Sequence, residues 1–292
     1  MAQIREIKQR MVAVGTIQRI TKTMQMIATA KFTAAVQRTR ATQPYTEKIR
    51  ELVQAVCSNP ADLDHPLVGT DHKPTGRDLL LVIGSDRGFC GAFNSNVLRN
   101  ALRFHRSLTE QGREVVVETA GRKAEAFFGF AHIEVTKSHD VGDKPAYETV
   151  AAIADDLMDR FIAGEFDTVR VAYMRFESNS RQIPEIQQLL PMEPPAGESS
   201  GEASGTGAMY EFTPDEESLL NSLLPQAIRT SLFQAFNDAV VSEQIMRMIA
   251  MKAATDNAAG LARSLKRDYN RARQARITTE LTEIVSGAAA LS

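Results

Sequence analysis

The chain has 292 residues, of which 43% are hydrophobic and 24% are charged, and its formal net charge is −2. This length and composition are typical of a protein of one or two domains with enough chain to bury a core. No apolar run reaches the ~20 residues that a bilayer crossing needs, and the N-terminus lacks the apolar core of a secretory signal. Two cysteines, Cys57 and Cys90, are too few for a disulfide framework or a metal site, and they favour a reducing compartment.

The near-neutral net charge hides basic ends and an acidic centre. Residues 1–58 carry 10 Lys and Arg against 3 Asp and Glu, and residues 226–292 carry 9 against 6. The remaining residues include 15 basic and 27 acidic side chains. The two ends are therefore expected to present basic surfaces.

The first 58 residues are predicted to form one long helix, because they contain only Pro44 and Gly15 as helix breakers. Their apolar residues follow the 3-4-3 spacing of a heptad seam, with a slip of one residue beside Gly15. The two predicted sets are Ile4, Ile7, Met11 and Val14, followed by Ile17, Ile20, Met24 and Ile27.

The centre, over residues 75–212, is predicted to be a Rossmann-like α/β domain. Strands and helices alternate there, which indicates a mainly parallel sheet covered on both faces. Residues 194–208 are rich in Gly, Ser and Pro and are predicted to form a flexible loop. The predicted strands cover residues 78–84, 114–119 and 168–176, and the predicted helices cover residues 95–108, 122–128 and 146–162.

The C-terminal part, residues 215–292, is predicted to be a second long helix. Its heptad seam begins at Ile228 and continues through Leu232, Ala235, Ala239, Ser242, Met246, Ile249 and Ala253. The apolar stripe then rotates through Leu261, Leu265, Tyr269 and Ala272 to Ile277, Leu281 and Ile284. At 1.5 Å per residue the two helices span roughly 80 and 90 Å, which is wider than a compact domain of this size. They are therefore predicted to pair as a long antiparallel coiled coil, with the last turns of the second helix projecting alone.

The sequence carries weak signals for chemistry. Gly84, Gly88 and Gly91 follow a strand and precede a helix, as in a phosphate-binding loop, but the Lys-Ser/Thr of that loop is missing. A structural turn is the favoured interpretation. The five histidines lack metal-ligand spacing, and no nucleophile with a neighbouring base is found, so no catalytic residue, metal or cofactor is predicted.

The basic helical ends leave two further interpretations open. A basic coiled coil could bind the phosphates of a nucleic acid, although no aromatic residues interleave with its cations. An α/β enzyme that uses a nucleotide and carries helical arms is the other alternative. The methionines near Met24 and Met246 are typical of coiled-coil cores and also of adaptable contacts with partner proteins.

Four segments resemble the gamma-subunit family of F-type ATP synthases. They are TIQRITKTMQMIATAK at residues 16–31, SDRGFCGAFN at residues 85–94, residues 242–257, and YNRARQARITTELTEIVSGAAA at residues 269–290. The resemblance extends over the whole chain in order, and the last motif is highly specific. It favours a partner-binding role over the two alternatives above.

The resemblance implies a rotor shaft that carries torque while the chemistry takes place in beta subunits. One copy of the chain would pass through a ring of alpha and beta subunits and stand on a c ring beside an epsilon subunit, without nucleic acid. It implies that Arg273, Gln274, Thr278 and Glu280 contact a catalytic-subunit loop, with Met24 close to the same level. It also implies that Tyr210 and Glu211 lie near the c ring and epsilon.

The resemblance is to the bacterial type of this family. The chain lacks the cysteine-bearing insertion of the chloroplast type and a transit peptide. We therefore expect a peripheral protein on the cytoplasmic side of the cell (inner) membrane.

Overall fold

The computed structural model describes residues 2–56, 65–68, 74–192 and 216–291, which form two compact units. One unit combines Met1–Ala30 with Arg247–Ser292, and the other comprises Lys31–Met246. Both long helices, α1 (Ala2–Val56) and α5 (Glu216–Leu291), contribute to both units. The predicted loop at 194–208, together with Tyr210 and Glu211, lies outside the described residues.

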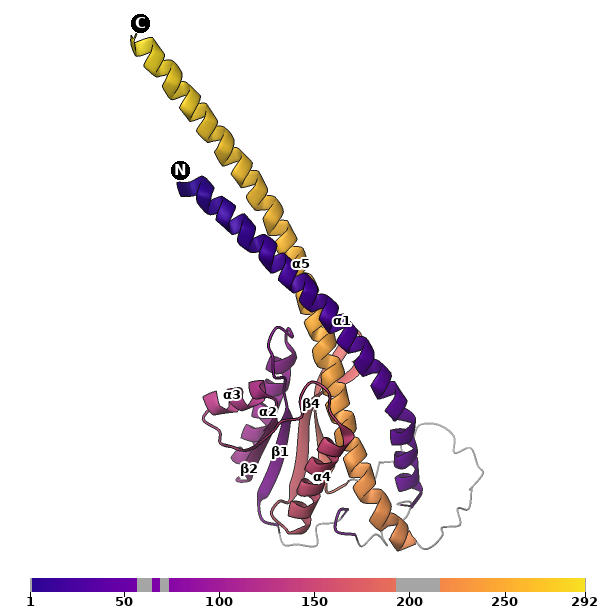
Figure 1. Ribbon diagram of the computed structural model, residues 1–292. Coiled ribbons are helices and arrows are strands. Elements are labelled where there is room, and N and C mark those ends of the chain that lie inside the picture. Colours follow the sequence, from indigo (N-terminus) through magenta and orange to yellow (C-terminus); the bar gives the residue numbers. More distant parts are fainter. Residues whose placement is uncertain (1, 57–64, 69–73, 193–215, 292) are drawn as a thin grey trace, which may run out of the picture. The chain divides into compact units, whose positions relative to one another are not determined.

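The larger unit contains a sheet of five strands in the order β3-β2-β1-β4-β5 (Figure 1). The first four strands in this order are mutually parallel, and β5 is antiparallel to β4. This confirms the predicted Rossmann-like fold on a mainly parallel sheet. The strands are β1 (Arg77–Ile83), β2 (Glu114–Ala120), β3 (Val135–His139), β4 (Thr168–Ser178) and β5 (Arg181–Leu190).

Helices cover both faces of this sheet, which is why the central strand β1 is buried from Asp78 to Ile83. The crossovers run outward from β1 to β3 and then back to β4. Right-handed crossovers of this order place α2 (Phe93–Glu110) and α3 (Arg122–Phe130) on one face and α4 (Tyr147–Ile162) on the other.

The first half of α5 is part of the hydrophobic core of this unit. It carries seven core residues, Leu224, Ala227, Ile228, Leu232, Ala235, Phe236 and Ala239. The buried hydroxyl of Ser242 also donates to the carbonyl oxygen of Met174 in β4, at 3.2 Å. The predicted seam from Ile228 to Ser242 is thus buried, but its partner here is the sheet domain.

In the smaller unit, α1 and α5 pair antiparallel, as predicted. The hydroxyls of Thr21 and Thr255 meet at 2.8 Å across the pair. Along α1 the buried and half-buried positions keep an unbroken 3-4 spacing, and those of α5 show the same spacing. The α1 positions are Ile4, Ile7, Met11, Val14, Gln18, Thr21, Gln25 and Ala28; the α5 positions are Met248, Met251, Thr255, Ala258, Ala262, Leu265, Tyr269 and Ala272.

Two details of the predicted seams are wrong. The slip beside Gly15 does not occur, and Ile17, Ile20 and Ile27 lie outside the seam with 52–53% of their surface exposed. On α5 the stripe rotates earlier than predicted, so that Ile249 is 50% exposed. Both errors arose because the largest apolar side chain was assigned to the seam, whereas the middle of the seam holds small and polar residues such as Thr21, Gln25 and Thr255. The other predicted seam positions that are exposed are Ala253, Leu261, Ile277, Leu281 and Ile284.

One carboxylate is buried where α5 packs on the sheet. Burial is the main cause that raises the pKa of Asp238 to about 7, and the negative charge of Glu185 adds to it. A hydrogen bond from the Gln234 amide at 2.8 Å, a backbone hydrogen bond from Phe176 and the charge of Arg175 only partly offset this effect. The buried hydroxyl of Tyr173 is a neighbour whose pKa is also raised.

The register of the helix pair can be tested by crosslinking. In a chain in which Cys57 is replaced by serine, and buried Cys90 is retained, we expect Thr21→Cys with Thr255→Cys to form a disulfide under mild oxidation, because these side chains face each other. The matched pair Ile20→Cys with Thr255→Cys should remain reduced, since Ile20 points outward. Equal yields for the two pairs, read on a non-reducing gel, would contradict this register.

The buried Asp238 should make the stability of the free chain depend on pH. An unfolded Asp ionises near pH 4, whereas Asp238 in the folded chain ionises only near pH 7. Because the folded state holds the proton to a higher pH, the free energy of unfolding falls by up to roughly 4 kcal/mol as the pH rises from 4 to 7.

Asp238→Asn removes this dependence, so the variant should be more stable than the original chain at pH 8 and little changed near pH 4. Urea unfolding at both pH values measures the difference. The control is Asp256→Asn at an exposed position of the same helix. A variant of Asp238 that loses stability at pH 8 would refute the assigned burial penalty.

Candidate functional site

The C-terminal end of α5 is a solvent-exposed surface. Residues 273–289 are all exposed, and they continue beyond the N-terminal end of α1 (Figure 1). The Thr21–Thr255 contact places Ile4 opposite Ala272 and the first residue of α1, Ala2, opposite Gln274, so the turns of α5 after Gln274 lie beyond α1. The chain thus presents about five turns of isolated helix.

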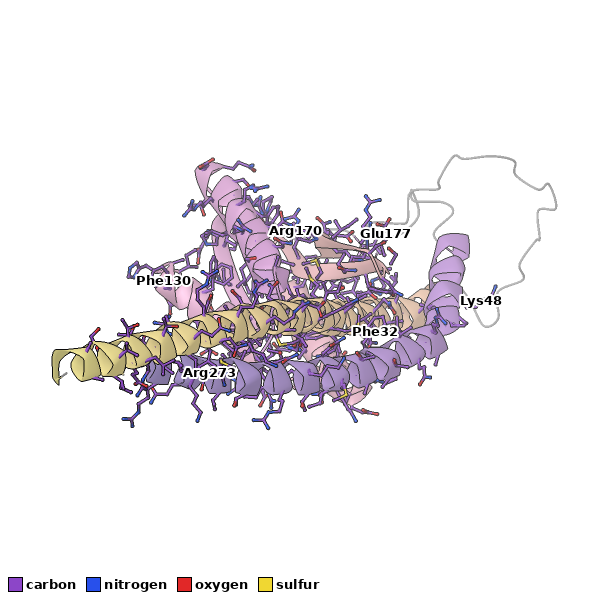
Figure 2. The ribbon with its side chains drawn as sticks, turned by 90° about the horizontal axis from the view of Figure 1, so that it is seen from above. Phe32, Lys48, Phe130, Arg170, Glu177 and Arg273 are labelled. Atoms are coloured by element: carbon purple, nitrogen blue, oxygen red, sulfur yellow. The ribbon has the colours of Figure 1, made fainter. Side chains whose placement is uncertain are left out.

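Four predicted contact residues lie on this exposed end: Arg273, Gln274, Thr278 and Glu280. Glu280 forms an ion pair with Arg276, with Nε and Oε1 2.6 Å apart. The Thr278 hydroxyl donates to the backbone carbonyl of Gln274 at 3.0 Å. Arg273, labelled in Figure 2, has no hydrogen-bond or ion-pair partner among the described residues. The guanidinium is therefore available to an acceptor on another molecule.

Met24 does not lie at the level of Arg273, which corrects the expectation. It follows Thr21 by one turn of α1, and Thr21 faces Thr255. Eighteen residues of helix, or roughly 27 Å, separate Thr255 from Arg273. Met24 is half-buried beside the seam and belongs to a different level of the helix pair.

Sequence reasoning missed the outward apolar faces of the helix pair. Large apolar side chains are exposed on both helices of this unit: Val12, Ile17, Ile20, Met26, Ile27, Ile249, Leu261, Ile277, Leu281, Ile284 and Val285. A slender two-helix unit that exposes so many of them presents surface typical of protein contacts. The sequence does contain this information, because each long helix has more apolar residues than a single seam can bury.

The glycine-rich turn after β1 is held by internal contacts. The carboxylate of Asp86 accepts a hydrogen bond from the N–H of Arg122, at the start of α3, at 3.1 Å. Gly121 has φ +102°, and a Cβ there would lie 2.5 Å from the carbonyl oxygen of Gly84. This turn leads into α2, and there the N–H of Ser85 donates to the side-chain oxygen of Asn94 at 3.1 Å while the Asn94 amide donates to the Ser85 hydroxyl at 2.7 Å. This agrees with the favoured structural turn.

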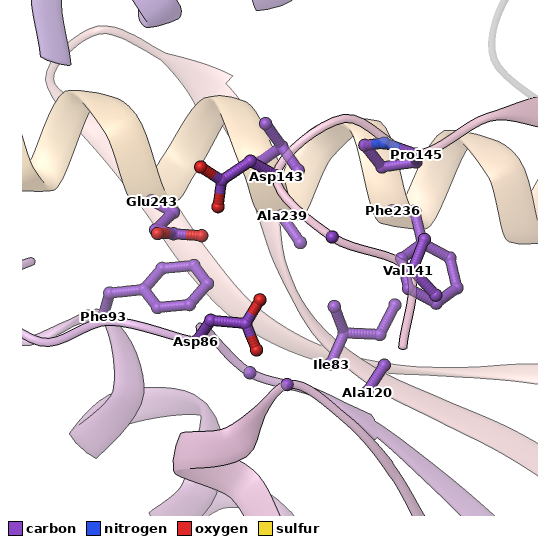
Figure 3. Close-up of a pocket in the computed structure, with 14 residues that line it drawn as sticks. Ile83, Asp86, Phe93, Ala120, Val141, Asp143, Pro145, Phe236, Ala239 and Glu243 are labelled. Carbon is purple, nitrogen blue, oxygen red and sulfur yellow. The ribbon is translucent and has the colours of Figure 1, made fainter. Parts of the chain in front are cut away.

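A narrow pocket lies at the same edge of the sheet, beneath α5 (Figure 3). Its free volume of about 30 Å³ admits one or two water molecules. Phe236 and Ala239 of α5 line it, together with carboxylates of Asp86, Asp143 and Glu243. In Rossmann-like sheets this edge receives the ligand, whereas here a helix of the same chain covers it.

The buried carboxylate of Glu118 is held by two side chains of the same domain. Burial opposes ionisation of Glu118, but hydrogen bonds from His139 at 2.7 Å and Arg160 at 2.6 Å outweigh it and lower the pKa of Glu118.

Within the described ranges, no group of three or more His, Cys, Asp or Glu could hold a metal ion. No helix in the described part of the chain combines the length and apolarity of a membrane span.

Comparisons with known proteins agree along the whole chain. A family model described as "ATP synthase" matches residues 3–291. The ATP synthase gamma chain of Rhodopirellula baltica is 38% identical, with 100% of this chain and 99% of the relative covered. That of Mannheimia succiniciproducens is 39% identical, with both chains fully covered.

Solved structures with the same fold come from mitochondrial ATP synthases. A chain in the OSCP/F1/c-ring structure from Euglena gracilis matches with a TM-score of 0.67 and 19% identity, covering 99% of this chain and 95% of that one. A chain in the central stalk/c-ring structure from Tetrahymena thermophila matches with a TM-score of 0.58 and 21% identity, covering 80% and 99%. On the full-length identity to curated relatives, this chain belongs to the ATP synthase gamma chain family.

Proposed function

We propose that this chain is the central rotor shaft of an F-type ATP synthase. Proton-driven rotation of a c ring would turn it, and its asymmetric helix pair would drive ATP synthesis or hydrolysis in the beta subunits. The observation that carries the proposal is the exposed helical end of α5 together with the outward apolar residues, in a chain of this family. Such a surface suits a shaft enclosed by a ring of partner subunits.

The partners follow from this role. One copy would contact alpha and beta subunits along the helix pair. The c ring and an epsilon subunit would contact the part of the chain that contains the α/β domain. The Euglena and Tetrahymena structures are assemblies with a c ring, which supports this arrangement. The chain would be peripheral to the cell membrane on its cytoplasmic side, without a cofactor of its own.

The chain is proposed to be non-catalytic. In the described residues, hydrogen bonds between Ser85 and Asn94 close the turn before α2, and α5 covers the carboxyl edge of the sheet. The pocket of about 30 Å³ is far smaller than the ~300 Å³ of a small-molecule site. Catalysis would then belong to the beta subunits.

Some proposed contact residues are supported by their exposure in the structure, and others only by resemblance to the family. Arg273 and Gln274 are exposed on the isolated end of α5 and can reach an acidic or carbonyl-rich loop, with Thr278 and Glu280 on the following turn. Met24 would contact a partner at a different level. Tyr210 and Glu211 remain proposed contacts to the c ring and epsilon by family resemblance.

Copurification tests the proposed function. Tagged chain expressed with the alpha and beta subunits of its own organism should copurify with both and restore rapid ATP hydrolysis. The purified chain alone should hydrolyse no ATP, since the residues that the structure describes offer no pocket large enough for a nucleotide. Recovery of the tagged chain without alpha and beta, or ATP turnover by the chain free of beta, would contradict the proposal.

Arg273→Ala should impair the complex and spare the fold. The side chain is exposed on an isolated helix, so its loss should leave the melting temperature of the free chain nearly unchanged. A charge-assisted hydrogen bond to a partner is worth about 1.5–3 kcal/mol, so ATP hydrolysis by the complex, or its yield, should fall about tenfold or more.

Arg106→Ala, at an exposed position of α2, is the matched control and should change neither quantity. Normal assembly and hydrolysis with Arg273→Ala would show that Arg273 makes no such contact.

A further inference from the structure

The two long helices are attached to the α/β domain very unequally. Seven residues of α5 belong to its hydrophobic core, whereas among the described residues of α1 only Ile49 does. Near the other end of this part of α1, Phe32 makes an edge-to-face contact with Phe176 of β4, with ring centroids 6.3 Å apart. Within this unit, the hydrophobic core therefore holds α5 at many positions and α1 at one described position.

One of these contacts is an ion pair at the first residue of α1 in this unit. The Nζ of Lys31 lies 2.7 Å from Oδ2 of Asp143. Lys31 is where the chain passes from the helical unit into the domain, since the unit boundary follows Ala30. The ion pair therefore ties α1 to the domain at the position where the unit begins.

Asp143 belongs to a short connection between β3 and α4 that also packs on α5. Val141, Gly142 and Pro145 of this connection line the narrow pocket together with Phe236 and Ala239 of α5. The backbone turns at Gly142, which has φ +69°, a conformation that favours glycine. The connection thus contacts both long helices, α5 by packing and α1 by charge.

The charge of Lys31 is also placed where negative charges gather. Figure 3 shows the carboxylates of Asp86, Asp143 and Glu243 around the same pocket. Replacing the ammonium by a carboxylate would add another negative charge to this group, and like charges at short range repel. The connection would then be pushed away from α1.

We propose that the Lys31–Asp143 ion pair is the positioning contact that passes rotation of the α/β domain into α1. The inference rests on the proposed rotor function and adds a specific route to it. α5 turns with the domain because it is part of the core. α1 is carried by its pairing with α5 over residues 4–28, and Lys31 adds a direct hold on the β3–α4 connection where α1 enters the domain. Without this ion pair, the part of α1 beside the domain can lag behind α5.

The effect of the Lys31–Asp143 ion pair on rotation can be measured separately from its effect on the stability of the fold. The side chains of Lys31 and Asp143 are 42% and 38% exposed, and exposed ion pairs contribute little to the free energy of unfolding. The domain offers a matched control in Lys137–Asp156, at 2.8 Å with exposures of 46% and 37%. This second pair joins β3 to α4 and does not involve either long helix.

The experiment uses the complete membrane-bound complex in vesicles. It measures ATP-driven proton uptake per ATP hydrolysed for Lys31→Glu, Lys31→Gln, Asp143→Lys and the exchanged pair Lys31→Asp with Asp143→Lys. The single changes should lower this ratio about twofold or more, because turnovers in which α1 lags hydrolyse ATP without moving protons, and the exchanged pair should restore it. The free chains should melt within a few degrees of the original.

Three results would overturn this proposal. They are an unchanged ratio of proton uptake to ATP hydrolysed in both variants of Lys31, no recovery in the exchanged pair, or an equal loss with Lys137→Glu and Asp156→Lys. If Lys31→Glu fails to assemble, Lys31→Gln decides, because it removes the charge without adding a repulsion. A complex with the original chain that hydrolyses ATP but pumps no protons would count against the rotor function itself.

Discussion

The length of the two terminal helices is the constraint on which the rest of the structure depends. A 76-residue helix such as α5 extends roughly 110 Å, and no domain of this size can cover it. The helix therefore divides its apolar surface. Leu232 and Phe236 are buried in the sheet domain, and Met251 and Ala258 face α1. The stripe rotates near Ile249, where the partner of α5 changes from the sheet domain to α1.

The middle of the seam on α1, from Gln18 to Ala28, is small and polar, and this leaves larger apolar residues on the outer surface. Gln18, Thr21 and Gln25 occupy heptad positions where isoleucine would pack more favourably, and the Thr21–Thr255 hydrogen bond fixes the register instead. Larger apolar residues such as Ile17 and Ile20 then remain on the outside. A pair of this kind gives up part of its own hydrophobic stabilisation and offers apolar contacts to a surrounding protein.

Sequence reasoning identified the elements with strong local signals. The buried run from Leu79 to Ile83 and the periodicity of α5 were sufficient to predict the parallel sheet and the helix pair. It missed β3 and β5, because edge strands such as Val135–His139 carry polar residues and lack an apolar run. The level of Met24 was also out of reach, since it depends on a register set by two threonines. The internal use of Asp86 at the start of α3 depends on a contact across 36 residues.

The Rossmann-like sheet has exchanged its usual role for an anchoring one. In a ligand-binding sheet the carboxyl edge is left open, and glycines let the backbone approach a phosphate. Here Gly121 is required by the close approach of the Gly84 carbonyl, and Phe236 of α5 covers the edge. The residues that would receive a nucleotide instead hold a helix, and the connection after β3 reaches the second helix through Lys31. The same topology that positions a cofactor in an enzyme can therefore fasten a rotating shaft, because both tasks need several loops to converge on one rigid edge.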